Sequence, residues 1–142
     1  MIAIRAHVTN GQDQHEVTVI TKDRSQTIAI PPKSGGKGSS ANGGELLFLA
    51  LATCYCNDLY REAARRGITV HGVEVEVSGE FGETPGNVAQ NVTYRARVTA
   101  EADEPTILDL ARHTDTVAEI QNTLRQGMAV TLEAVEAVPV GD

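Results

Sequence analysis

Basic residues are scarce in this 142-residue sequence, which has 12 lysines and arginines against 19 acidic residues and a net charge of −7. Binding to nucleic acid needs clustered lysines and arginines that neutralise phosphates, so no nucleic-acid partner is expected. An anionic membrane surface is a poor partner for the same reason. The most apolar stretch, residues 46–52, is far shorter than the ~20 residues that span a bilayer. We therefore expect no membrane partner.

Cysteine is also rare, because only Cys54 and Cys56 are present. Two cysteines this close together cannot form the disulfide framework of a small secreted protein. The N-terminus lacks the basic start and the long apolar run of a signal peptide. We therefore expect a cytoplasmic protein with reduced thiols. If both cysteines lie in one helix, their side chains point about 200° apart, which disfavours a disulfide between them.

Several motifs that would indicate a cofactor or a catalytic class are missing. The Cys-x-Cys pair has no second pair, and the four histidines fall in separate predicted elements, so neither a metal nor another cofactor is expected. In the glycine-rich stretch 33–44, Lys37 is followed by Gly38, which does not fit a phosphate-binding loop. The sequence has no Gly-x-Ser-x-Gly element, which argues against a serine hydrolase.

The order of predicted elements indicates one α+β domain over residues 1–142. Aromatic residues make up only 4% of the chain and tryptophan is absent, so the core must be mainly aliphatic. The strands come as meanders, with Asn10-Gly11-Gln12-Asp13 as the first turn, and no βαβ unit is visible. Residues 116–119, Thr-Val-Ala-Glu, have the pattern of a capping box. Predicted strands cover residues 2–9, 16–22, 25–30, 68–81, 91–100 and 128–138, and predicted helices cover residues 45–66, 106–112 and 117–125.

The longest predicted helix, residues 45–66, has two different halves. Residues 46–52 are apolar on every face, which predicts burial all round. In the second half, Leu59 and Ala63 are expected to point inward. Its charged side chains, Asp58, Arg61, Glu62 and Arg65, are expected to point outward. A helix buried on all sides is unusual in so small a domain, and it indicates either enclosure by sheets or burial against a second subunit.

Residues 43–54, Gly-Gly-Glu-Leu-Leu-Phe-Leu-Ala-Leu-Ala-Thr-Cys, resemble the central-helix signature of the OsmC-like superfamily. That superfamily includes osmotically inducible protein C and the organic hydroperoxide resistance proteins. Residues 122–127, Asn-Thr-Leu-Arg-Gln-Gly, resemble the helix that follows the second motif of the family. The resemblance implies one OsmC-like domain with an N-terminal β-meander, a long buried central helix and an antiparallel sheet with short helices. It also implies an intertwined homodimer.

Many members of the superfamily reduce organic hydroperoxides with a thiol, and the resemblance implies site residues here. Cys54 matches the cysteine that attacks the peroxide and becomes a sulfenic acid. Glu45 lies near the position of the glutamate that helps to polarise this thiol. Arg5 and Arg24 are the only arginines before the long helix, so they are the candidates for the activating arginine of the family.

The second cysteine of the family, which forms a disulfide with the first, is missing from this sequence. The family's Cys-Pro-x-x-Asn-Thr-Leu appears here as residues 118–124, Ala-Glu-Ile-Gln-Asn-Thr-Leu, with Ala118 at the resolving position. Cys56 is an accessory candidate, although its direction on the helix keeps it from simply replacing that partner.

Three functions remain open at this point. The first is a stress-response enzyme that reduces organic hydroperoxides through Cys54 with the help of an external thiol. The second is a homodimer without catalysis that binds a small apolar or thiol-reactive ligand in its interface pocket. The third is a stable dimer in which Cys54 is inert.

Overall fold

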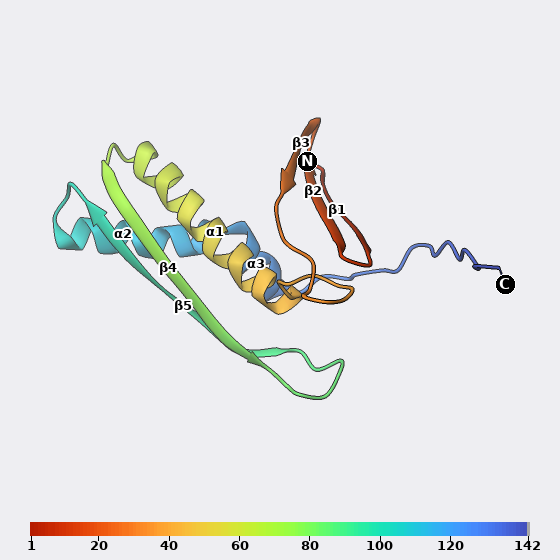
Figure 1. The fold of residues 1–142 in the computed structure, drawn as a ribbon. Helices are drawn as coiled ribbons and strands as arrows, with labels where there is room; N and C mark the ends of the chain where they lie inside the picture. Colours follow the sequence, from red (N-terminus) through yellow and green to blue (C-terminus); the bar gives the residue numbers. More distant parts are fainter. Residues whose placement is uncertain (142) are drawn as a thin grey trace. The chain divides into compact units, whose positions relative to one another are not determined.

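The computed structural model describes residues 1–141 and has an α+β architecture, as predicted (Figure 1). The chain forms two compact units, one of residues 1–50 and 77–93 and the other of residues 51–76 and those from Tyr94 onward. Helix α1 and strands β4 and β5 run through both units, and the prediction of a single domain stays a prediction. The elements are β1 (Ile4–Gly11), β2 (Gln14–Thr21), β3 (Arg24–Ile28), α1 (Gly43–Arg65), β4 (Val70–Phe81), β5 (Ala89–Ala100), α2 (Glu104–Val117) and α3 (Glu119–Gln126).

Strands β1, β2 and β3 form the predicted antiparallel meander, with β2 in the centre. The first turn differs from the prediction, since Asn10 and Gly11 belong to β1 and pair with β2. The chain reverses at Gln12 and Asp13 instead, where Asp13 adopts a positive φ of 57°. Aspartate tolerates this left-handed conformation better than most residues do. Both faces of β1 and β3 are exposed, so this sheet buries little apolar surface within one chain.

The second unit holds the core cluster, which joins α1 to α2. Tyr55, Leu59 and Ala63 of α1 pack with Leu110 of α2, and side chains of β4 and β5 surround them. Leu59 and Leu110 are fully buried, so the predicted inward direction of Leu59 and Ala63 is confirmed. Figure 1 shows α1 lying beside the β4–β5 hairpin.

The first half of α1 is not buried all round, so that prediction is wrong for a single chain. Phe48 stacks on Phe81, with their ring centroids 5.8 Å apart. Leu46 remains exposed, and the Leu49 side chain is 59% exposed. The physical reason is that one chain supplies packing partners for only one side of this half.

Helix α2 is longer than predicted, and it ends just before α3 begins. Its start is capped by Asp103, whose carboxylate accepts a hydrogen bond from the Thr106 N–H. The predicted capping box at the start of the next helix is wrong. Ala118 is the N-cap residue of α3, and the Thr116 hydroxyl donates to the His113 carbonyl instead. The Glu119 side chain is consequently available for other contacts.

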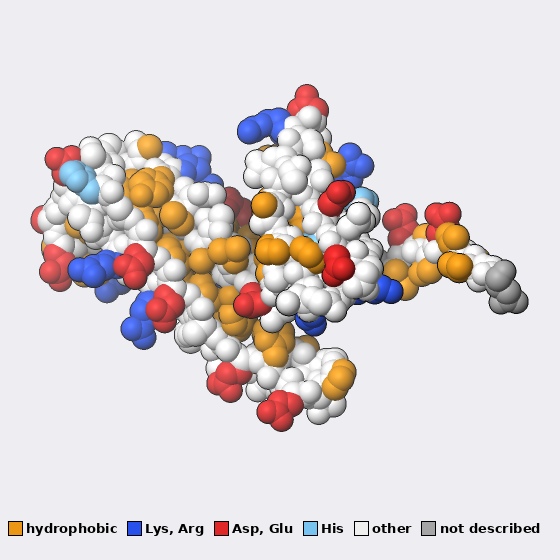
Figure 2. Space-filling view, in the orientation of Figure 1, with side chains coloured by type: hydrophobic (Ala, Val, Ile, Leu, Met, Phe, Trp, Pro, Cys, Tyr) orange, Lys and Arg blue, Asp and Glu red, His pale blue; other side chains and the backbone are white. Residues whose placement is uncertain are grey.

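Residues 127–141 form neither a helix nor a strand, so the strand predicted over 128–138 is wrong for a single chain. A strand needs a neighbouring strand to pair with, and among the described residues none pairs with residues 128–138. Its apolar side chains face solvent, with Val130 90% and Leu132 82% exposed (Figure 2). Among the described residues, no helix is long and apolar enough to cross a membrane.

Candidate functional site

The Cys54 thiol lies among charged groups rather than in an aliphatic pocket. Its sulfur is 3.5 Å from Asp58 Oδ2, one turn further along α1, and 3.8 Å from Glu119 Oε2 in the first turn of α3. The backbone N–H of Ile120 also donates a hydrogen bond to the sulfur. The side chain is half-buried. The start of α3 is therefore directed at the thiol, and helix N-termini favour negative charge.

The core packing of α1 sets the direction in which Cys54 points. Leu51, Tyr55 and Leu59 recur at every fourth position and are buried. Cys54, Asp58 and Arg61 lie at positions i, i+4 and i+7, so they share a second face of α1 that is adjacent to the buried one. Once the first face is fixed against the core, the second face must meet α3.

Helix α3 is held in place by side-chain hydrogen bonds. The Gln121 amide is buried and donates to the Leu51 carbonyl at 3.0 Å, which fixes α3 to α1 one turn before Cys54. Near the other end, the Arg125 guanidinium donates to the Asp115 carboxylate at 2.7 Å. The Tyr94 hydroxyl of β5 donates to the same carboxylate. Glu119 thus belongs to a helix anchored at both ends.

A single arginine, Arg61, contacts three carboxylates at this site. Its guanidinium lies 3.0 Å from Asp58, 2.9 Å from Glu62 and 3.3 Å from Glu119. The Glu62 carboxylate also lies 2.8 Å from His113 Nε2 of α2. The side chains of Asp58 and Glu62 are buried, which corrects the prediction that both point into solvent. We call Cys54, Asp58, Arg61 and Glu119 the thiol cluster.

The electrostatics of the thiol cluster disfavour the thiolate form of Cys54. Burial of the sulfur raises the pKa of the Cys54 thiol, and the negative charges of Asp58 and Glu119 act in the same direction. The hydrogen bond from the Ile120 N–H acts in the opposite direction but does not outweigh them. Burial and a hydrogen bond with Glu119 raise the pKa of Asp58, whereas that hydrogen bond and Arg61 lower the pKa of Glu119.

The thiol cluster also contains possible metal ligands. One ligand atom each from Cys54, Asp58 and Glu119 lies within 4.8 Å of the other two. However, the Arg61 guanidinium already bridges the two carboxylates, so a positive charge occupies the place of a cation. Structural zinc sites are also normally completed by four protein ligands. These residues therefore fit a hydrogen-bonded thiol better than a metal ion.

Of the residues predicted to assist Cys54, Glu45 has a different partner in the structure. Its carboxylate accepts a hydrogen bond from the Asn42 N–H, and its own N–H donates to the Asn42 side chain, which forms a capping box for α1. Glu45 lies nine residues before Cys54, about 13.5 Å along the helix axis and on the opposite side. It cannot reach the thiol of its own chain, and its catalytic role stays a prediction.

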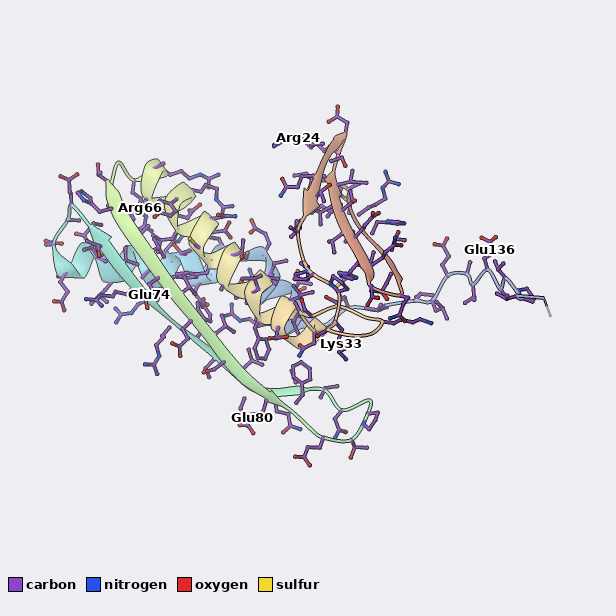
Figure 3. The ribbon with its side chains drawn as sticks, viewed as in Figure 1. Arg24, Lys33, Arg66, Glu74, Glu80 and Glu136 are labelled. Atoms are coloured by element: carbon purple, nitrogen blue, oxygen red, sulfur yellow. The ribbon has the colours of Figure 1, made fainter. Side chains whose placement is uncertain are left out.

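The two candidate arginines, Arg5 and Arg24, both lie in the meander. Arg5 is in β1, and Arg24, labelled in Figure 3, begins β3 directly after the turn that follows β2. Both are exposed. Their role as activating residues also stays a prediction.

Cys56 lies in α1, and Ala118 lies directly before α3. Cys56 points toward β4, where it lines a hollow of about 260 Å³ with Val73 and Val75, while Cys54 faces α3. Both thiols are free. Ala118 is fully buried and directly precedes the first turn of α3, which contacts Cys54. The position to which the resemblance assigns the missing second cysteine is thus close to the thiol.

Sequence reasoning missed three members of the thiol cluster: Asp58, Arg61 and Glu119. The helical spacing of Asp58 and Arg61 from Cys54 was a usable signal for the first two. Glu119 gave no such signal, because it belongs to another helix and its own pattern indicated a capping box.

The described fold agrees with comparisons to known proteins. A family model for OsmC-like proteins matches residues 36–133, which is more than half of the chain. This protein therefore belongs to the OsmC-like family. Among curated protein sequences, none matches this chain significantly.

Solved structures with the same fold come from several bacteria. An OsmC-like protein from Mycoplasma pneumoniae is 18% identical with a TM-score of 0.61, covering 85% of this chain and 87% of its own. An organic hydroperoxide resistance protein from Legionella pneumophila is 21% identical with a TM-score of 0.55, covering 88% and 89%. Another organic hydroperoxide resistance protein, from Elizabethkingia anophelis, is 18% identical with a TM-score of 0.56, covering 87% and 88%.

The raised pKa of Cys54 predicts slow alkylation at neutral pH. The rate of iodoacetamide modification at Cys54, followed by peptide mass spectrometry, should reach half of its maximum at a pH above the ordinary thiol value of about 8.5. Replacing Glu119 by glutamine should move this midpoint to lower pH, because a negative charge near the sulfur is lost. A wild-type midpoint well below about 8.5 would contradict the described environment.

Proposed function

We propose that this protein acts in a stress response by reducing organic hydroperoxides through Cys54. The observation that carries the proposal is the thiol cluster: Cys54, which the resemblance assigns to the reactive position, contacts an arginine-linked carboxylate pair. A merely structural cysteine of α1 would be expected to pack against aliphatic side chains. The printed names of two structural relatives, both organic hydroperoxide resistance proteins, support the same chemistry.

The proposed reaction uses one cysteine of the protein and an external thiol. The Cys54 sulfur attacks one peroxide oxygen, the O–O bond breaks, and the products are a sulfenic acid on Cys54 and an alcohol. Ala118 cannot form the disulfide that a second cysteine would provide, and Cys56 faces β4. Two external thiols then restore the Cys54 thiol and leave as a disulfide with water. The proposed compartment is the cytoplasm, where such thiols are kept reduced.

The second candidate is a ligand-binding protein without catalysis, and the burial of Cys54 beside two carboxylates favours it. The raised pKa of Cys54 reduces the fraction of thiolate, which is the nucleophilic form of cysteine. The same scaffold with an unreactive thiol could hold a small apolar or thiol-reactive molecule. The two candidates differ in whether Cys54 is oxidised by a peroxide.

The peroxidase proposal is tested by turnover with cumene hydroperoxide and dithiothreitol. The wild type should consume peroxide faster than the uncatalysed mixture, and Cys54→Ser should reduce the rate to that background. Cys56→Ser is the matched control and should keep most of the activity, because the proposed reaction does not use it. Equal, background-level rates for the wild type and Cys54→Ser would exclude the peroxidase and leave the ligand-binding candidate.

We further propose that the functional unit is a homodimer. Three surfaces are exposed in one chain: Leu49 of α1, both outer strands of the meander, and the apolar residues of the tail, 127–141. Outer strands with free N–H and C=O groups can pair with another chain, and the tail has alternating apolar residues suited to a strand. Burial of these side chains against a second copy would supply the driving force for association.

The oligomeric state is tested by size-exclusion chromatography with light scattering. The expected mass is about twice the 15.1 kDa of one chain. Leu49→Glu should shift the equilibrium toward the monomer, because it would bury a charge in the proposed interface. Val88→Glu, which changes an exposed residue of the loop between β4 and β5, should leave the mass unchanged. A monomeric wild type at micromolar concentration would contradict the proposal.

A further inference from the structure

We propose that Asp58 and Glu119 form a proton-accepting carboxylate pair for the Cys54 thiol, with Arg61 as the residue that positions both. This inference rests on the proposed function and identifies the groups that would make it work in this chain. The residues that activate the Cys54 thiol then come from α1 and α3, and Glu45, Arg5 and Arg24 are not required.

Geometry is the first argument. Two carboxylates from different helices contact the same sulfur, at 3.5 Å from Asp58 and 3.8 Å from Glu119. Both distances are within the range for a thiol that donates to oxygen. A proton acceptor must be within hydrogen-bond reach of the proton it takes, and both residues meet that condition. The Asp58 side chain is 9% exposed and that of Glu119 is 64% exposed, so one carboxylate is fixed inside while the other borders solvent.

The balance of charge around Arg61 is the second argument. Its single guanidinium serves Asp58, Glu62 and Glu119, so the carboxylates outnumber it. Of these, Glu62 has further partners in His113 of α2 and Arg65 of α1. Asp58 and Glu119 both pair with Arg61. Their two negative charges exceed its one positive charge, which leaves a net negative charge next to the thiol. An excess of negative charge stabilises an added proton.

The positions of the thiol and the two carboxylates allow a reaction in which protons and electrons balance. As the Cys54 sulfur bonds to the distal peroxide oxygen, its proton passes to the carboxylate pair. The O–O bond breaks, and the departing alkoxide takes a proton from the pair to become an alcohol. The sulfur loses two electrons and the peroxide gains them, so the carboxylates end as they began. The mechanism needs no preformed thiolate, which agrees with the raised pKa of Cys54.

The proposal predicts opposite effects on two reactions of the same thiol. In Asp58→Asn and in Glu119→Gln, oxidation of Cys54 by cumene hydroperoxide at pH 7 should slow about 100-fold, at the low end of the range for general-base catalysis. Alkylation of Cys54 by iodoacetamide should instead become faster, because a neighbouring negative charge is lost. Asp109→Asn is the control, since this exposed carboxylate of α2 pairs with Arg66 outside the cluster, and it should change neither rate.

The outcomes separate this inference from the proposed function. Oxidation that speeds up together with alkylation would show that the carboxylates only suppress the thiolate, which overturns the inference. Oxidation that is unchanged in both variants overturns it as well. Peroxide consumption by the wild type that is no faster than by Cys54→Ser would instead contradict the proposed function itself. Glu119 is exposed, so its variant should fold even if Asp58→Asn, checked by circular dichroism, does not.

Discussion

The packing of Tyr55, Leu59 and Ala63 against Leu110 is the contact on which the rest of the site depends. Burial of these side chains fixes the rotation of α1 about its axis. That rotation places the adjacent face, with Cys54, Asp58 and Arg61, against the start of α3. A rotation of one residue, about 100°, would direct the thiol elsewhere and dissolve the thiol cluster. The surroundings of the Cys54 thiol therefore depend on the aliphatic and aromatic core that packs against the adjacent face of α1.

The thiol cluster balances two opposing influences on one sulfur. An amide N–H at the start of α3 favours the thiolate, while burial and two carboxylates favour the thiol. Enzymes that use cysteine often lower the pKa of the thiol in advance, with a nearby cation or a helix N-terminus. Here the only nearby guanidinium described by the structure, that of Arg61, is engaged by the carboxylates. The arrangement therefore suits a proton transfer during the reaction better than a thiolate formed before it.

Local patterns predicted most elements of the fold, and long-range contacts account for the failures. The predicted helix 45–66 corresponds to α1 (Gly43–Arg65), and the strand 68–81 to β4 (Val70–Phe81), because periodicity is a local property. Residues 128–138 are predicted as a strand that Pro139 ends, but a strand also needs a paired neighbour, which the described residues do not supply. Cys54 was found through its motif. Asp58 was read as solvated because it is charged, and only the approach of α3 explains its burial.

The most direct test of the account is the fate of Cys54 after one equivalent of cumene hydroperoxide in the absence of reductant. Dimedone, which labels sulfenic acids, should then be found on Cys54 by peptide mass spectrometry, with Cys56 unmodified. This result follows if Cys54 reacts and neither Ala118 nor Cys56 can resolve the sulfenic acid. A disulfide between Cys54 and Cys56, or no modification of Cys54, would contradict the account.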